Sequence, residues 1–336
     1  MQLPPTMRAL TLRATAPEPE LVGAEVAVPR PGPGEVLVRM AASPINPNDL
    51  LFLHDRYEVK RPLPTVPGFE GSGTVVAAGG GLLARALVGR RVALTAGAAS
   101  GLWSEYAVAP ATQCAPLRRG MSFEQGAVLL TNPMTAFVLA AQAGREGVKA
   151  VVLTAAASAL GVMLNRLFAR RKIAVINVVR SEKSRAILER EGAETILLEG
   201  RPDFRQALAA EAKQRGATLA LDAVGGEMTG TLIAALPERS TVRVYGMMAG
   251  EPTRVDASDL VFGSKRVEGF TMYEWVRRTS LARQLWTLGR VQRLAGSALG
   301  TRIHSRHPLS DFATALDLAR SPSTAGKVLF TLAPTT

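Results

Sequence analysis

The chain has 336 residues, 47% of them hydrophobic and 20% charged, which is typical of a soluble globular protein large enough for two domains. Its single cysteine, Cys114, excludes a disulfide framework and a multi-cysteine zinc site within one chain. The net charge is +12, but the basic residues are mostly scattered arginines without interleaved aromatic residues, so we expect a solvated surface, or one that attracts an acidic substrate, and no nucleic-acid partner.

The location is expected to be the cytoplasm, without a membrane partner. No apolar run reaches the ~18 residues that cross a bilayer. The first ten residues, MQLPPTMRAL, also lack the basic-then-apolar order of a secretion signal.

The first part of the chain, up to about residue 125, is predicted to be rich in β-strands. Residues 35–40 alternate polar and apolar side chains, as a half-buried strand does, and a run of prolines and glycines forms a turn before them. Residues 43–50 indicate a rigid loop that leads into a short helical stretch. Further strands are expected at 74–77, 88–94 and 103–108.

The second part alternates helices and strands, which predicts a doubly wound parallel sheet. It begins with a helix capped by Ser122 and continued by the apolar residues 127–143, with a break at Asn132-Pro133. A last strand at 327–332 is expected to rejoin the first domain. The remaining strands are predicted at 195–198, 219–224 and 241–245, and the remaining helices at 184–191, 204–214, 228–236, 275–294 and 311–320.

The chain is organised around residues 151–180. A short apolar run at 150–153 predicts a buried strand, and small residues from Ala155 onward form a tight turn after it. Apolar residues at helical spacing then predict a helix to about Phe168, and 173–179 is a second, β-branched strand. Strand, turn, helix and parallel strand make one βαβ unit.

The turn of this unit is the candidate cofactor site. The pyrophosphate of a dinucleotide sits on the N-terminus of such a helix, which requires small residues around it. The usual G-x-G-x-x-G fingerprint reads Ala156, Ser158 and Gly161 here, so two of its three glycines are replaced. An alanine-rich packing turn without a ligand is the alternative interpretation.

The end of the second strand favours NADPH over NADH. NAD enzymes place a carboxylate there to hold the ribose hydroxyls, whereas this chain has Arg180, followed closely by Lys183. A guanidinium can bind a 2′-phosphate through two hydrogen bonds. The alternative is that Arg180 is a solvated charge at the end of a strand.

The chain resembles the medium-chain dehydrogenase/reductase (MDR) superfamily across nearly its whole length. The resemblance rests on six motifs in the family's order: VPGFEGSG, TNPMTA, TAAASALG, LDAVGG, VYGMMAG and GKVLF. It implies an α/β protein with a GroES-like, β-rich catalytic domain (residues 1–126, completed by 301–336) and a Rossmann NADP-binding domain (127–300). It also implies a homodimer.

The resemblance is to the zinc-free branch of this family. Asn46 stands where zinc-dependent members have a catalytic cysteine, and their glycine-histidine-glutamate motif reads Gly68-Phe69-Glu70. The four-cysteine structural lobe of those members has no counterpart. Because zinc sites of this kind use thiolate and imidazole ligands, we expect a zinc-independent enzyme without a metal.

Two subfamilies compete within this branch. The strings PINPNDLLFLHDRY, GLWSEYAV and INVVRSEK are most like those of mitochondrial-type 2-enoyl thioester reductases, which implies hydride transfer from NADPH to a conjugated C=C. Tyr57 would be the proton donor, since a phenol is neutral at pH 7. An NADPH:quinone oxidoreductase or general enone reductase is the second hypothesis, and a non-catalytic nucleotide-binding sensor is the third.

The resemblance assigns further roles. Asn46 would position the nicotinamide or the substrate, and Trp103 would line the acyl pocket. The cofactor would be bound by Thr135, Ala157, Ser158, Ala159, Leu160, Arg180, Lys183, Tyr245, Gly246, Met247, Phe270 and Lys327. The alternatives are a loop-capping amide for Asn46, a ring packed at the domain rim for Tyr57, a core side chain for Trp103 and a strand-edge charge for Lys327.

Overall fold

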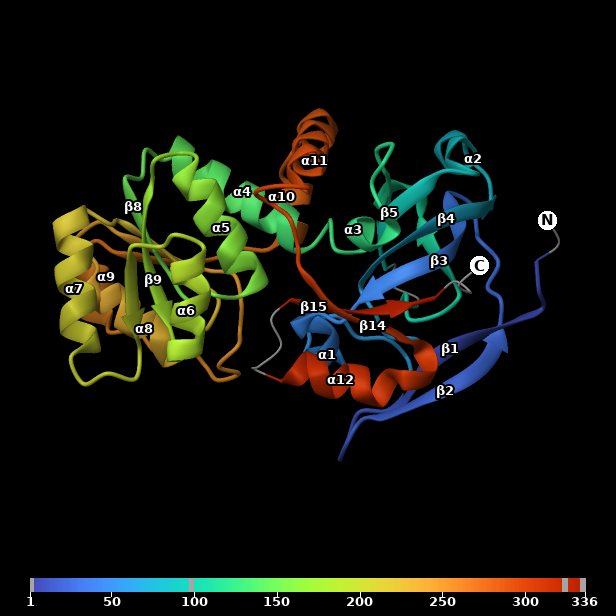
Figure 1. Cartoon of the computed structure of the whole chain (residues 1–336), viewed down its shortest axis with the longest axis horizontal. Coiled ribbons are helices and arrows are strands. Elements are labelled where there is room, and N and C mark those ends of the chain that lie inside the picture. Colours follow the sequence, from blue (N-terminus) through green and yellow to red (C-terminus); the bar gives the residue numbers. More distant parts are fainter. Residues whose placement is uncertain (1–2, 97–99, 322–325, 333–336) are drawn as a thin grey trace. The chain divides into compact units, whose positions relative to one another are not determined.

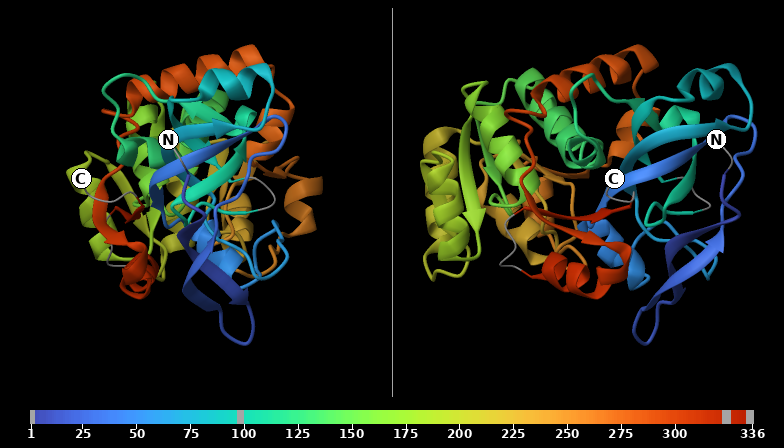
Figure 2. Two further views of the ribbon diagram at one scale, coloured as in Figure 1. Left: turned by 90° about the vertical axis from the view of Figure 1, so that its right-hand side faces the viewer. Right: turned by 45° about the vertical axis from the view of Figure 1, so that its right-hand side comes forward.

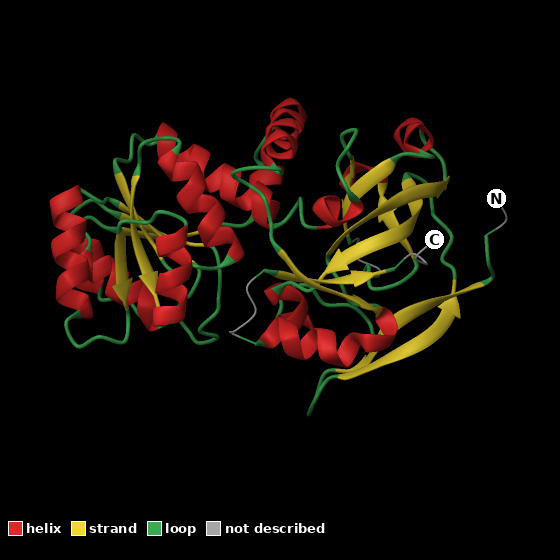
Figure 3. Cartoon of the chain, viewed as in Figure 1, coloured by secondary structure: helices red, strands yellow, loops and turns green. Residues whose placement is uncertain are grey.

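The chain divides into two compact units in a computed structural model that describes residues 3–96, 100–321 and 326–332. The first unit, here called the β unit, comprises Met1–Thr131 and Thr301–Thr336, and the second, the Rossmann unit, comprises Asn132–Gly300. Each unit has its own sheets and its own hydrophobic core, and the strands of both are seen in Figure 3.

The β unit is built on a seven-stranded sheet of order β14-β15-β3-β4-β5-β7, in which β6 also pairs with β3. These strands are β3 (Glu35–Pro44), β4 (Glu70–Ala78), β5 (Arg91–Thr95), β6 (Tyr106–Pro110), β7 (Cys114–Pro116), β14 (Ile303–Pro308) and β15 (Lys327–Thr331). A separate antiparallel pair consists of β1 (Thr6–Ala14) and β2 (Glu20–Ala27). The helices are α1 (Pro47–Leu53), α2 (Leu82–Leu87), α3 (Phe123–Ala127) and α12 (Phe312–Arg320), with short 3-10 turns η1 (Ala111–Gln113) and η2 (Leu309–Asp311).

Strand β15 pairs with strands of the β unit. It pairs antiparallel with β3 and parallel with β14, and Figure 1 shows it beside both. Phe330 of this strand is fully buried and packs edge-on against Trp103, with ring centroids 5.1 Å apart. Lys327, the first residue of β15, is thereby fixed in the interior of the β unit.

The Rossmann unit is built on a parallel six-stranded sheet of order β10-β9-β8-β11-β12-β13. Counted along the chain this is the order 3-2-1-4-5-6 of the doubly wound dinucleotide-binding fold, which reverses between β8 and β11. The strands are β8 (Ala150–Leu153), β9 (Ala174–Val179), β10 (Thr195–Leu198), β11 (Leu219–Asp222), β12 (Thr241–Val244) and β13 (Arg266–Gly269). The helices are α4 (Asn132–Arg145), α5 (Ala159–Ala169), α6 (Glu182–Arg190), α7 (Phe204–Arg215), α8 (Glu227–Ala235), α9 (Ala257–Val261), α10 (Met272–Arg277) and α11 (Leu281–Leu294).

Helices cover both faces of this sheet. On one face, apolar residues of α7 and α8 share a buried cluster with Val152 of β8 and Ile176 of β9. The flanking strand residues Val151 and Leu153 are also buried, and they point to the opposite face because side chains alternate along a strand. Helices α5 and α7 lie on opposite sides of β8 and β9 (Figure 1 and Figure 2). Burial on both faces explains why these strands are continuous apolar runs.

Two predicted helices are wrong in their bounds. The helix expected over 127–143, with a break at Asn132-Pro133, instead begins at Asn132, because α3 ends at Ala127. Residues 275–294 do not form a single helix, because α10 ends at Arg277 and α11 begins at Leu281. The Gln284 side-chain amide, from α11, donates to the carbonyls of Val276 and Thr279 and so links the two helices. None of the helices in the described part of the chain combines the length and the apolarity needed to cross a bilayer.

Candidate active site and cofactor site

Four polar side chains meet in the interior of the β unit, and we call them the buried polar cluster: Asn46, Asp49, Glu70 and Lys327. Each is at most 8% exposed. Asn46 and Asp49 belong to the start of α1, Glu70 begins β4 and Lys327 begins β15. The pairing of β3 with β4 and with β15 brings these three segments together, since β3 ends at Pro44, just before Asn46.

A continuous chain of hydrogen bonds runs through this cluster. The Lys327 ammonium donates to Asn46 Oδ1, and Asn46 Nδ2 donates to Glu70 Oε2 at 3.2 Å. Glu70 Oε1 accepts the backbone N–H groups of Leu130 at 2.6 Å and of Thr131 at 2.8 Å. The Asn46 amide is therefore held at both ends by ionisable side chains.

Asp49 ties two neighbouring loops to the cluster. Its carboxylate accepts the backbone N–H of Asn46 at 2.6 Å and that of Phe69 at 3.0 Å. Burial raises the pKa of Asp49 to about 7, against the effect of these bonds and of Lys327. Burial also raises the pKa of Glu70 and lowers the pKa of Lys327, so each charge in the cluster depends on its partners.

Tyr57, the expected proton donor, lies beside this cluster. Its ring packs edge-on against Phe69, with centroids 5.1 Å apart, and the backbone N–H of Phe69 is held by Asp49. Tyr57 is half-buried, and burial raises its pKa above the ordinary value of 10.0. The phenol is therefore protonated at neutral pH, and the β unit brings Tyr57, Asn46 and Lys327 into one region.

Arg61 also lies in this part of the β unit, beside Phe69, and it was not identified from the sequence. Its guanidinium lies 5.2 Å from the ring centroid of Phe52 and 4.7 Å from that of Phe69. Burial lowers the pKa of Arg61 to about 10, which leaves it charged at neutral pH. Asp49 and Glu70 were also given no role in advance, although Glu70 stands in the recognised Gly68-Phe69-Glu70 motif.

Trp103, the expected wall of an acyl pocket, is fully buried in the core of the β unit. Its indole N–H donates to the carbonyl of Pro44 at 3.3 Å. A Cβ at Gly68 would lie 2.5 Å from the indole, which explains the glycine at this position. This packing matches the alternative interpretation of Trp103 as a core residue, and its contact with a substrate remains a prediction.

In the Rossmann unit, the turn after β8 has the geometry of a phosphate site. Ala155 adopts a left-handed conformation, with φ of 45°, and Ser158 caps α5 by accepting the Gly161 N–H at 3.1 Å. Ala157, Ala159 and Leu160 complete the turn and the first helical positions. The N–H groups that open a helix have no partner inside it and carry a partial positive charge, which fits an anionic ligand.

The ends of β8 and β11 are linked by a polar network at the reversal point of the sheet, where such folds bind ligands. Thr154 Oγ1 donates to Asp222 Oδ1 at 2.8 Å, and the backbone N–H groups of Val224 and Gly225 donate to the same carboxylate at 2.9 and 3.3 Å. Asp222 is fully buried. The network fixes the loop that follows β11, and Asp222 too was missed by the sequence reasoning.

The residues expected near the nicotinamide follow neighbouring strands. Tyr245 and Gly246 come directly after β12, and the Tyr245 hydroxyl is buried without a hydrogen-bond partner in the described structure. A Cβ at Gly246 would lie 2.5 Å from the carbonyl oxygen of Ala223, so this position requires glycine. Met247 is exposed, Phe270 follows β13 and is half-buried, and Thr135 is buried in α4.

Arg180 and Lys183, which were expected to bind the 2′-phosphate, lie in the Rossmann unit. Arg180 follows β9, and both side chains are exposed. Glu199, which follows β10, is close enough for Arg180 to lower its pKa, although burial raises the pKa overall. A carboxylate therefore neighbours Arg180, and the sequence reasoning did not foresee it.

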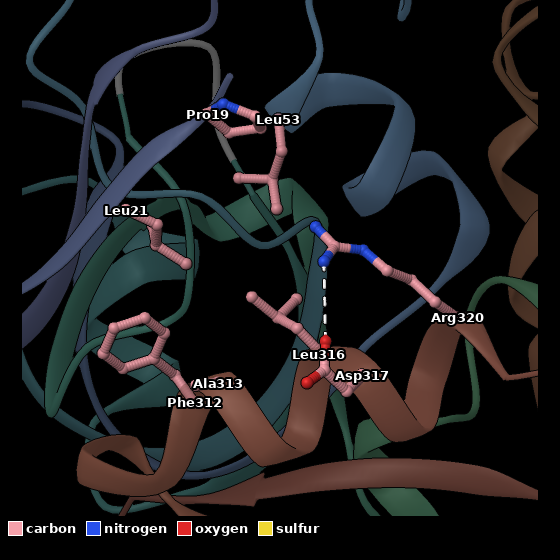
Figure 4. A pocket seen from close by; sticks show the side chains of 8 residues that line it. All are labelled: Pro19, Leu21, Leu53, Phe312, Ala313, Leu316, Asp317 and Arg320. Carbon is pink, nitrogen blue, oxygen red and sulfur yellow. Dashed lines mark ion pairs between the residues drawn. The ribbon is translucent and has the colours of Figure 1, made fainter.

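A separate apolar pocket of about 190 Å³ lies on the β unit, at α12 (Figure 4). Leu53 and Leu316 are among its walls, and the ion pair between Asp317 and Arg320, 3.7 Å apart, stands at its side. None of the predicted site residues lines this pocket.

The buried polar cluster does not fit a metal ion. Lys327 already places a cation on Asn46, and a metal at the same oxygen would face the ammonium charge. No group of three or more His, Cys, Asp or Glu residues suited to a metal occurs in residues 3–96, 100–321 and 326–332. We derive no step through a metal.

The doubly wound sheet of the Rossmann unit and the small-residue turn before α5 are typical of proteins that bind dinucleotides. The family model of the alcohol dehydrogenase GroES-like domain matches residues 32–119, and that of the zinc-binding dehydrogenases matches 159–287. The chain belongs to the medium-chain dehydrogenase/reductase superfamily.

Three known proteins show which kinds of reductase this chain is similar to. A Mesorhizobium loti structure described as a candidate NADPH:quinone reductase is 32% identical, with a TM-score of 0.90, and the match covers 98% of this chain and 100% of that one. A mycobacterial protein solved with NADPH is 25% identical, with a TM-score of 0.82, over 97% and 99% of the two chains. The mitochondrial enoyl-[acyl-carrier-protein] reductase of Bos taurus is 28% identical over 90% of this chain and 82% of its own. The first and third of these proteins are described as reductases, and the second was solved with NADPH. Together they support a nicotinamide cofactor.

Proposed function

We propose that the protein is an NADPH-dependent, zinc-independent reductase of a conjugated C=C in a 2-enoyl thioester, with Tyr57 as the proton donor. The observation that carries this proposal is the protonated, half-buried Tyr57 phenol beside the cluster that contains Asn46. The similarity to the bovine mitochondrial enoyl reductase supports the substrate class.

The proposed chemistry needs two groups from the β unit. A bound nicotinamide supplies hydride to the β-carbon, and the electron pair of the double bond moves toward the thioester oxygen. An amide N–H such as that of Asn46 stabilises this negative charge. Tyr57 transfers its proton to the α-carbon and is reprotonated from water, so the product is the saturated thioester.

The proposed cofactor is NADPH, held by the Rossmann unit. The turn from Ala157 to Leu160 would carry the pyrophosphate at the start of α5. The exposed Arg180 and Lys183 would bind the 2′-phosphate. The NADPH-bound mycobacterial neighbour supports a cofactor of this kind.

Isotope transfer tests the reaction directly. NADPH that carries deuterium at the transferable position is incubated with crotonyl-CoA, and the product is analysed by mass spectrometry and NMR. The proposal predicts butyryl-CoA with one deuterium on the β-carbon and a solvent-derived hydrogen on the α-carbon. NADPH binding without any saturated product would contradict it, and NADPH binding without turnover of either an enoyl thioester or a quinone would favour the nucleotide-binding sensor.

A quinone reductase is the second candidate. The Mesorhizobium loti neighbour, at 32% identity over its whole length, favours it. This candidate predicts rapid NADPH oxidation with a benzoquinone and no formation of deuterated butyryl-CoA from crotonyl-CoA, which is the opposite pattern.

A cytoplasmic homodimer completes the proposal. Among the strands that the structure describes, β13 is at one edge of the Rossmann sheet, and an edge strand can pair with a strand of a second copy. Light scattering would support this with a mass twice the 35.6 kDa of one chain. A mass of one chain at micromolar concentration would contradict it.

A further inference from the structure

We propose that Lys327 is a positioning residue for the reaction and that it acts through Asn46. In this proposal Lys327 and Glu70 lock the Asn46 amide in one orientation and polarise it, so that its remaining N–H is the donor for the thioester oxygen. The inference rests on the proposed reductase function and gives Lys327 a different role from the expected contact with the cofactor.

The orientation of the amide follows from the chemistry of its two neighbours. The Lys327 ammonium can only donate hydrogen bonds, so it must face the oxygen of the Asn46 amide. The Glu70 carboxylate can only accept, so it must face the nitrogen, 3.2 Å away. A flipped amide would set ammonium against N–H and carboxylate against carbonyl oxygen, which is repulsive at both ends.

The Asn46 amide keeps one donor for a ligand. Its nitrogen carries two hydrogens, and Glu70 takes one of them. The positive charge of Lys327 on the amide oxygen draws electron density from the nitrogen, which strengthens the remaining N–H as a donor. A donor that is oriented in advance stabilises a developing oxyanion without reorganisation.

The remainder of the cluster keeps Lys327 and Glu70 in place. Two backbone N–H groups, of Leu130 and Thr131, hold the second oxygen of Glu70. Asp49 fixes the backbone of Asn46 through its N–H, and its charge together with that of Glu70 favours the protonated form of Lys327. These contacts leave the Asn46 amide little freedom to rotate.

The contacts of Lys327 argue against the view that it only binds a phosphate group of the cofactor. Its ammonium donates to Asn46 Oδ1, whereas Arg180 and Lys183, the residues proposed for the 2′-phosphate, are exposed side chains of the Rossmann unit. A phosphate ligand and a positioning residue also predict different kinetics. Loss of a phosphate contact weakens NADPH binding, whereas loss of the orientation of Asn46 lowers kcat.

The test compares Lys327→Met and Lys327→Arg with wild type, using crotonyl-CoA turnover and direct titration of NADPH. We expect Lys327→Met to lower kcat by about tenfold to a hundredfold, while the Kd for NADPH changes by less than about threefold. Lys327→Arg keeps the charge and should recover part of the loss. An NMR spectrum of the Asn46 side-chain amide should change in Lys327→Met and return toward wild type in Lys327→Arg.

Two further variants separate this role from a general loss of structure. Lys265 is a lysine of the Rossmann unit whose side chain is 7% exposed and which pairs with Asp259 at 2.8 Å, so Lys265→Met is a matched control that should lower stability but leave kcat unchanged. If Lys327 acts through Asn46, Lys327→Met should reduce kcat far less in an Asn46→Ala background than in wild type.

The outcomes distinguish the inference from the function on which it rests. If wild type reduces crotonyl-CoA but folded Lys327→Met retains full kcat, or mainly loses affinity for NADPH, the positioning role is wrong and the reductase function stands. Additive effects of Lys327→Met and Asn46→Ala would also overturn it. If wild type reduces no enoyl thioester, the proposed function itself fails.

Discussion

At the residue scale, the proposed preference for NADPH rests on Arg180, together with Lys183. Arg180 is exposed just beyond β9, with Glu199 nearby. Arg180→Ala should weaken NADPH binding by about tenfold to a hundredfold, as expected for one charge-assisted contact, and leave NADH binding nearly unchanged. Titration of both dinucleotides checks this, with the exposed Arg205→Ala of the same unit as a control. Equal loss for NADPH and NADH would show that Arg180 does not bind the 2′-phosphate.

Asp49 should make folding stability depend on pH. Its pKa is raised from 3.8 to about 7 by burial, so the unfolded chain loses this proton at lower pH than the folded chain does. The stability it contributes is therefore present below about pH 4 and is lost as the pH rises through about 7. Between about pH 5 and about pH 8, urea unfolding should show a smaller loss of stability for Asp49→Asn than for wild type.

The exposed Asp317→Asn is the control for removal of a carboxylate from the same unit. It should keep the pH dependence of the wild type. If Asp49→Asn loses as much stability with rising pH as the wild type does, the titration of Asp49 is not the cause.

At the element scale, the proposed cofactor binding depends on the turn between β8 and α5. A Cβ at Gly161 would lie 2.3 Å from the carbonyl oxygen of Ala156, which is backbone and cannot move aside easily. Gly161→Ala should therefore destabilise the protein by about 1–3 kcal/mol and weaken NADPH binding. Gly289→Ala in α11 is the control. Its new Cβ would have no contact closer than 3.8 Å, so this variant should not destabilise the protein. Thermal unfolding with and without NADPH measures both variants.

Helices and strands could be predicted where the local sequence pattern determines them. The strands β8 and β10 have the expected bounds, because burial on both faces makes apolar runs. The bounds of α5 and α7 are within a residue or so of the expected ones, since Ser158 caps the start of α5 and Gly216, in a left-handed conformation, ends α7. The break between α10 and α11 was not predicted, because it depends on the Gln284 side chain reaching back to the preceding helix.

The candidate site could be predicted only in part. Asn46, Tyr57 and Lys327 were chosen by resemblance, and the structure brings them into one region of the β unit. The buried polar cluster as a whole is not predictable from the sequence, because Asp49 and Glu70 are charged residues, which usually lie at the surface. Their burial depends on β15 pairing with β3, a contact between segments almost three hundred residues apart.

At the scale of the whole molecule, the net charge of +12 should influence the capture of anionic substrates. Acyl-CoA is a multiply charged anion, so its kcat/KM should fall roughly tenfold as ionic strength rises from about 0.01 M to about 0.2 M. At saturating NADPH, kcat/KM for an uncharged enone should change much less over the same range of ionic strength. A similar salt dependence for both substrates would show that the surface charge does not guide the thioester.

The most direct test of the account is the comparison of crotonyl-CoA and a benzoquinone as substrates for wild type and Tyr57→Phe, with NADPH saturating. The account predicts that wild type reduces crotonyl-CoA with the higher kcat/KM and that Tyr57→Phe lowers kcat for the thioester by about 10²–10⁴-fold, with an unchanged Kd for NADPH. Preference for the quinone, or full thioester turnover without the Tyr57 hydroxyl, would contradict it.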